Sequence, residues 1–428
     1  MELSSVQSGT YKLTSRRKEL LYYFGFLLWP FGILLASFKN WRKPWAKNVF
    51  WLFCIFFGLT FIIGKDDGPD SFNYAMQFLR YAGSELKFKE LLTSFYSESG
   101  SFVDIASPVI SYLVSRISHN PQILFAVFGF IFGYFYSRNA WFILERLNGK
   151  LTFFILLFLS TLLLTNPIWN ICNFRFWTAA QIFLYGSLPY LVNGNKKKLI
   201  WAFISVLFHF SFIFALGILI IFMVARNRVN LYLGFFLLTS FIKEINLQSV
   251  QSIFSFLPGA FQGHVSGYTN IDYAERVSNL WQMNNWYLVF SSKVIRWCIY
   301  MMVLFVYIRC MKHLRNRNDL LTLFCFSLLL IGASNIFSLV PSGNRFLVVS
   351  ATFIFSFFIL FIASFQEIRG LKIILAISTP LLMLFCIVSL RSGMDFYGLI
   401  TVIGNPFFKA VSIDTYPLIE GLKKVTSL

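Results

Sequence analysis

Residues 151–164 read LTFFILLFLSTLLL, and no charged side chain interrupts this run. Apolar runs of roughly 18–25 residues recur along most of the chain, which suits helices that cross a hydrocarbon core of ~30 Å at ~1.5 Å per residue. A transmembrane β-barrel would instead show segments of ~10 residues that alternate in polarity, and this run does not alternate. The sequence therefore predicts an all-α protein whose helices span a lipid bilayer.

The composition excludes a water-soluble fold. Of the 428 residues, 57% are hydrophobic and only 13% are charged, whereas about a quarter of the residues of a soluble domain are charged. The net charge of +19 comes from short basic clusters between apolar runs, which is typical of cytoplasmic anchors. We therefore expect the lipid bilayer, and no nucleic acid, among the partners.

The apolar runs predict a single integral membrane domain over 1–428, with about 10–12 spans in a polytopic transmembrane helical bundle. The candidate spans are residues 20–37, 48–64, 121–144, 151–167, 174–192, 199–225, 230–244, 286–309, 319–340, 346–366 and 371–390.

The basic loops predict how the bundle lies in the bacterial inner membrane. The clusters within 39–47, 196–198 and 309–317 should face the cytoplasm. The remaining segments then face the periplasm: a loop over 65–120 with short helices, a loop over 245–285 and the tail 391–428.

Two segments conflict with this scheme. Residues 199–225 are too short for two full crossings, yet Lys196–Lys198 precede them and Arg226 follows them. A bent or re-entrant element near His209 would explain basic residues at both ends, because irregular backbone is tolerated at membrane depth where protein or water surrounds it. The run 20–37 should begin outside, but Arg16 and Arg17 precede it.

A few polar residues stand out because ionisable groups are costly at membrane depth and usually functional there. Asp70 and Tyr74 share a helix face after the second span; an N-capped periplasmic helix is the alternative reading. Arg175, Arg345 and Arg391 are expected at outer span ends, where their guanidinium groups could bind a phosphate or could simply reach the interface.

His209 lies in an otherwise apolar run, with Ser211 two residues later. It is either a functional group at the foot of a cavity or a hydrogen-bonded histidine between helices. No cofactor or metal is expected, because the four histidines fall in separate segments and the six cysteines form no CxxC pair.

In these features the chain resembles the EpsG-like branch of the Wzy-type bacterial polysaccharide polymerases, which make O-antigen, capsule or exopolysaccharide. The similarity rests on elements in order: Asp-x-x-x-Tyr-x-x-x-Phe at Asp70, Tyr74 and Phe78, then Arg-x-x-x-Ala at Arg175 and Ala179. A basic turn follows at 196–198, then Phe-His-x-Ser at 208–211 and an arginine at 345.

The sequence departs from the family pattern at two places. Phe176 stands where relatives more often have glutamine after the arginine, so the role of that polar residue is lost or moved. Gly68 and Pro69 replace the usual glycine and threonine, which leaves Asp67 or Asp70 as the family aspartate. The spacing to Tyr74 favours Asp70.

The resemblance implies a GT-C-like polymerase that joins oligosaccharide repeat units carried on undecaprenyl diphosphate, at the periplasmic face and without a metal. It implies Asp70 and His209 as catalytic candidates, with Tyr74, Arg175, Ser211, Arg345 and Arg391 in substrate binding. Either Asp70 or His209 could be the general base. A chain-length regulator and a flippase of the same pathway are expected partners.

Two other classes fit some of the same residues. A flippase for lipid-linked oligosaccharides would also need basic residues facing a cavity, although transporters usually contain internal repeats and none is visible. A membrane acyltransferase could use His209.

Overall fold

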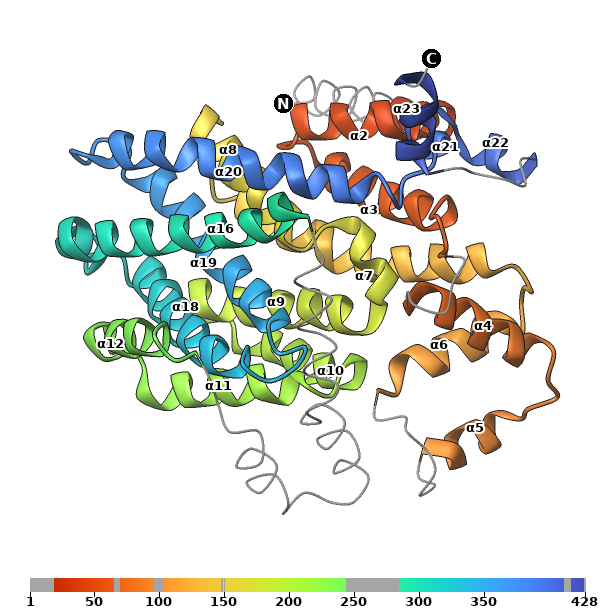
Figure 1. Ribbon diagram of the computed structural model, residues 1–428, viewed down its shortest axis with the longest axis horizontal. Coiled ribbons are helices and arrows are strands. Elements are labelled where there is room, and N and C mark those ends of the chain that lie inside the picture. The colour runs from red at the N-terminus through yellow and green to blue at the C-terminus, as the bar shows by residue number, and fades with distance from the viewer. Residues whose placement is uncertain are drawn as a thin grey trace, which may run out of the picture.

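The computed structural model describes residues 19–64, 70–95, 104–147, 149, 151–243, 285–411 and 417–426. These residues form helices, with no strand among them (Figure 1), which confirms the predicted all-α class. The helices are α2 (Pro30–Lys39), α3 (Pro44–Leu59), α4 (Asp70–Ala82), α5 (Phe88–Phe95), α6 (Ala106–Ser115), α7 (Pro121–Leu144), α8 (Phe153–Thr165), η1 (Ile168–Asn173), α9 (Phe174–Asn193), η2 (Lys196–Lys198), α10 (Leu199–Phe208), α11 (Phe212–Ala225), α12 (Val229–Thr239), α16 (Trp286–Phe305), η3 (Val306–Cys310), α17 (Met311–Leu314), α18 (Asn318–Phe337), α19 (Arg345–Ser364), α20 (Leu371–Gly393), α21 (Leu399–Ile403), α22 (Pro406–Val411) and α23 (Leu418–Thr426).

Within the described residues, six helical stretches are long and apolar enough to cross a membrane, so the chain is a multi-pass membrane protein. They are Pro121–Leu144, Phe153–Asn193, Trp286–Leu314, Asn318–Phe337, Arg345–Ser364 and Leu371–Gly393. The 41-residue stretch Phe153–Asn193 holds two of the predicted spans. Pro167 separates them, because proline disfavours helical backbone at the residue before it, and the 3₁₀ turn η1 then leads into α9.

Helices α3 and α7 pack with their backbones almost in contact. A Cβ atom at Gly129 would collide with the carbonyl oxygen of Cys54, and one at Gly58 with the carbonyl oxygen of Phe125. Gly133 lies one turn further along α7 and faces the Cys54 side chain. Small residues four apart are a common means of close helix packing in membranes.

Helix α10 runs antiparallel to α9. At the basic turn that joins them, Gly186 packs against the backbone of Ala202. At the other end of α10, the Phe208 ring lies 6.1 Å from the ring of Phe174, the first residue of α9. Helix α10 therefore rises from the basic turn to the start of α9.

Helix α11 then returns to the level of the basic turn. Near its start, Phe212 contacts Phe176 of α9 and Phe346 of α19. Just after its end, Asn227 donates a hydrogen bond of 3.2 Å to the side-chain oxygen of Asn318, at the start of α18. Residues 199–225 thus form a helical hairpin broken at 209–211, which confirms the bend that was predicted near His209.

The N-terminal segment is a second hairpin, and the prediction of one span over 20–37 is wrong. Helix Glu19–Leu28 ends at Trp29, whose backbone leaves the helical region at φ −147° and ψ 83°. A Cβ on Gly25 would lie 3.0 Å from Ile33 Cδ1, whereas residues eight apart on one straight helix are separated by ~12 Å. Tyr22 stacks on Trp45 at 3.8 Å between ring centroids, so both ends of the hairpin lie near the start of α3.

The bundle has two chemically different ends. At one, here called the basic end, Lys47 at the start of α3 pairs with Glu145 after α7 at 3.2 Å, and the turns at 196–198, 226–228 and 311–317 lie there too. The opposite end, here called the site end, carries α4, α5 and α6 on one side and the tail helices α21–α23 on another (Figure 1). All described loops that were predicted to be cytoplasmic therefore share one end.

Candidate functional site

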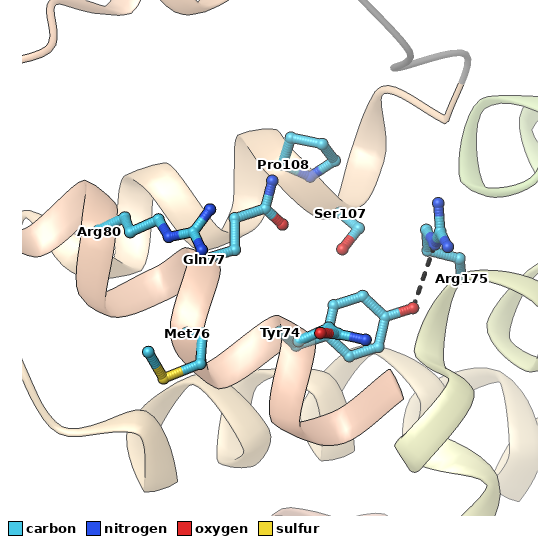
Figure 2. Close-up of a pocket in the computed structure, with 8 residues that line it drawn as sticks. Tyr74, Met76, Gln77, Arg80, Ser107, Pro108 and Arg175 are labelled. Carbon is cyan, nitrogen blue, oxygen red and sulfur yellow. Dashed lines mark hydrogen bonds between the residues drawn. The ribbon is translucent and has the colours of Figure 1, made fainter. Parts of the chain in front are cut away.

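Arg175, the second residue of α9, is held between two partners at the site end. Its Nε donates a 3.1 Å hydrogen bond to the Tyr74 hydroxyl from α4, drawn as the dashed line in Figure 2. Its Nη1 lies 3.3 Å from Oδ2 of Asp104, just before α6. The side chain remains 42% exposed, so part of the guanidinium group is accessible to a ligand.

Asp104 links Arg175 to the break in the α10–α11 hairpin. Its Oδ1 accepts a 2.8 Å hydrogen bond from the backbone N–H of Phe210, which a continuous helix would have paired with a carbonyl. Its Oδ2 lies 3.9 Å from Nε2 of His209. One carboxylate that is only 8% exposed therefore holds together the cap helices, α9 and the hairpin.

The hydrogen bonds of His209 define its tautomer. The backbone N–H of Ser211 donates to His209 Nδ1 at 3.3 Å, and the Ser211 hydroxyl lies 2.7 Å from the same atom. Nδ1 is therefore an acceptor, and Nε2, which faces Asp104, carries the proton of the neutral ring. The order Ser211, His209, Asp104 is that of a hydroxyl, a base and an orienting carboxylate.

Arg345 joins this site through a shared aromatic ring. The guanidinium carbon of Arg345 lies 5.6 Å from the centre of the Phe176 ring, a cation–π contact. The same ring also contacts His209, at 5.1 Å between centroids and 82° between planes. Phe176 is only 3% exposed, so its buried ring packs against both side chains.

The hydroxyl of Tyr74, which accepts the hydrogen bond from Arg175, is uncharged. Burial raises the pKa of Tyr74 to about 12, an effect that the positive charge of Arg175 opposes and that the negative charge of Asp70 reinforces. Its ring packs edge-on against Phe128 at 5.5 Å. Tyr74 is therefore protonated at physiological pH and is unsuited to act as a base.

A family model for the EpsG family matches residues 49–400, which is most of the chain. The chain belongs to the EpsG family. This family is related to the Wzy-like polysaccharide polymerases. No curated protein and no solved structure matches the chain.

The structure brings most of the predicted EpsG-family site residues together. Tyr74, Arg175, His209 and Ser211 are linked through Asp104, and Arg345 is joined through Phe176. Asp70 is the first residue of α4, about one turn before Tyr74. Five segments that are distant in sequence thus meet at the site end.

Arg391 is the exception among the predicted residues. It forms an ion pair of 3.3 Å with Asp395, four residues later at the end of α20, and no described contact links it to Arg175 or Arg345. Among the residues that the structure describes, no group of three or more His, Cys, Asp or Glu side chains could hold a metal ion.

The sequence did not single out Asp104. It is one of seven acids in the acidic stretch 65–120, and nothing in its local pattern separates it from the others. Its role depends on the close approach of the start of α6 to both α9 and the hairpin. This packing brings Asp104 into contact with Arg175, 71 positions later in the sequence, and with His209, 105 positions later.

Proposed function

We propose that this protein is a glycosyltransferase that polymerises oligosaccharide repeat units carried on undecaprenyl diphosphate. The support is one observation above all: Arg175 contacts Asp104 of a base-like Asp104–His209 pair, and Arg345 contacts the Phe176 ring that packs against His209, at one end of a membrane bundle. Membership of the EpsG family supports this class of reaction. The basic end would face the cytoplasm of a bacterial inner membrane, and the site end the periplasm.

The arginines would bind the diphosphate of the donor. Guanidinium groups pair phosphate oxygens in a planar fork and keep their charge at every physiological pH. Arg175 has a side chain fixed by Tyr74 and Asp104 and remains partly exposed. A preorganised cation of this kind stabilises the negative charge that develops on the leaving diphosphate, so the reaction needs no metal.

The acceptor hydroxyl would be activated by His209 acting through Ser211. The hydroxyl oxygen forms a bond to C1 of the donor sugar as the bond between C1 and the diphosphate oxygen breaks. The acceptor proton passes to Ser211 Oγ while the Ser211 proton passes to His209 Nδ1. Asp104 would stabilise the imidazolium on its Nε2 side, and undecaprenyl diphosphate leaves as the anion.

This reaction also requires partners. Repeat units made in the cytoplasm need a flippase to reach the site end, and a chain-length regulator would set the number of additions. Both are proposed partners of this chain.

Replacement of Arg175 and Arg345 by lysine tests the proposal. Lysine keeps the charge but loses the planar fork, so each change should remove on the order of 2–4 kcal/mol of transition-state stabilisation, roughly 30- to 1000-fold in rate. The polysaccharide ladder on a gel should shorten or vanish. Arg369→Lys, an exposed arginine at the basic end, is the control.

Three results bear on the proposal. Single repeat units on the lipid carrier, with no ladder, in a strain that lacks the protein support a polymerase. Absence of any exported repeat unit would instead indicate a flippase. Normal ladders from both Arg→Lys variants, at wild-type protein levels, would overturn the diphosphate assignment.

A further inference from the structure

A cavity of about 280 Å³ opens beside Arg175 and Tyr74 (Figure 2). Helices α4 and α6 form most of its wall, with Arg175 and Tyr74 at one edge. Small-molecule sites usually measure ~300–1000 Å³, so this cavity suits one small polar group such as a single sugar ring. The lining residues are Asn73, Tyr74, Met76, Gln77, Arg80, Ser107, Pro108 and Arg175.

The cavity contains a buried polar atom without a partner. Ser107 is 1% exposed, and its hydroxyl forms no hydrogen bond within the described structure. Figure 2 shows this hydroxyl directed toward the space between Gln77 and Tyr74. A buried hydroxyl without a partner destabilises the protein, and a ligand that pairs with it would remove that cost.

The opposite wall adds further donors and acceptors. Gln77 donates its amide N–H to the Tyr81 hydroxyl at 3.0 Å, and no described residue uses its amide oxygen. Arg80 is exposed and forms no ion pair with any residue that the structure describes. Met76 and Pro108 supply apolar surface. An amide, a hydroxyl, a guanidinium group and small apolar faces together match a sugar with several hydroxyl groups.

The charge of the lining residues indicates which kind of sugar the cavity prefers. Two arginines, Arg80 and Arg175, line the cavity, and none of its described lining residues carries a carboxylate. Arg175 already has Asp104 as a counter-ion, whereas Arg80 has none among the described residues. The cavity therefore favours a ligand that brings a negative charge to the Arg80 side.

We propose that this cavity binds a sugar of the lipid-linked repeat unit, and that Arg80 selects an acidic sugar such as a uronic acid. The inference rests on the proposed polymerase function. It fits the geometry because the cavity shares Arg175 with the site, and Asp104 connects Arg175 to His209 over 3.3 and 3.9 Å. Apart from Arg175, the lining residues come from the short helices α4 and α6, outside the six long apolar stretches, where a sugar rather than a lipid chain belongs.

Binding of small probes tests this site without requiring polymerase activity. The full-length protein in lipid nanodiscs would be titrated with methyl β-glucuronide and with methyl β-glucoside, using saturation-transfer NMR. These probes share one ring and differ in a carboxylate. We expect the glucuronide to bind roughly tenfold more tightly, the effect of one hydrogen bond to a charged group.

Two variants and one control assign the preference to Arg80. Arg80→Gln should reduce glucuronide binding roughly tenfold and leave glucoside binding unchanged. Asn73→Asp, which adds a negative charge to the exposed rim, should act in the same direction. Lys89→Gln removes an exposed positive charge from α5, outside the cavity, and should change neither affinity.

The outcomes separate this inference from the proposed function. Equal affinity for the two probes, no binding of either, or an unchanged preference in Arg80→Gln and Asn73→Asp would overturn the proposed sugar site. None of these results would alter the ladder phenotype that tests the polymerase.

Discussion

Replacement of Asp104 by asparagine would test the centre of the proposed site. The substitution keeps the size of the side chain and preserves an oxygen that can accept the N–H of Phe210 at 2.8 Å. It removes the negative charge beside Arg175 and His209, and it turns an amide N–H₂ group toward Arg175 Nη1. The hairpin break should therefore survive while the electrostatics of the site change.

The expected size of the effect follows from the contacts. A hydrogen bond to a charged group contributes about 1.5–3 kcal/mol, and the value here should fall at the low end because Arg175 is 42% exposed and partly screened. A loss of about 1–2 kcal/mol in the transition state corresponds to a rate roughly 5- to 30-fold lower. The substitution also removes the carboxylate that would stabilise the His209 imidazolium, and this loss should lower the rate further.

The assay is the initial rate of repeat-unit addition in membrane vesicles that contain equal amounts of protein. Asp395→Asn is a matched control, because Asp395 also pairs with an arginine Nη1 at 3.3 Å but is 52% exposed and stands apart from the cluster. We expect little change in the control. If the two variants have rates within a factor of two of each other, the assignment of Asp104 to the site is refuted.

Three further predictions follow. Tyr74→Phe should lower the rate several-fold without shifting the pH–rate profile below pH 10, because a hydroxyl with a pKa of about 12 stays protonated there; a shift of the alkaline limb would contradict this. Gly129→Ala should destabilise the protein by about 1–3 kcal/mol, since its Cβ would meet the Cys54 carbonyl oxygen, whereas Gly217→Ala in the open part of α11 should be neutral or stabilising; equal melting temperatures would exclude the close helix contact. In a cysteine-free background, Ile117→Cys, a position 85% exposed, should react with an impermeant maleimide in intact spheroplasts, and Lys197→Cys only after permeabilisation; the reverse pattern would invert the orientation.

Several features of the site could be predicted from the sequence because they are local. An arginine at the start of an apolar run, such as Arg175 or Arg345, can be recognised from the sequence without knowledge of the fold. The break at His209 follows from basic residues at both ends of a run that is too short for two crossings. The N-terminal hairpin was missed because the break at Trp29 and Pro30 lies within a run of ordinary span length, and hydropathy alone does not distinguish a bend from a crossing.

The sequence by itself determined that this chain is a helical membrane protein, that its basic loops share one side, and which arginines lie at the ends of apolar runs. Apolar length and charge asymmetry are properties of short segments, so they need no tertiary contact. Only the tertiary structure decided that Asp104, rather than any other acid of 65–120, connects Arg175 to His209, and that Phe176 positions both His209 and Arg345. Those contacts join residues up to about 170 positions apart in the sequence. Helix packing determines which residues meet, and packing cannot be predicted from any one segment alone.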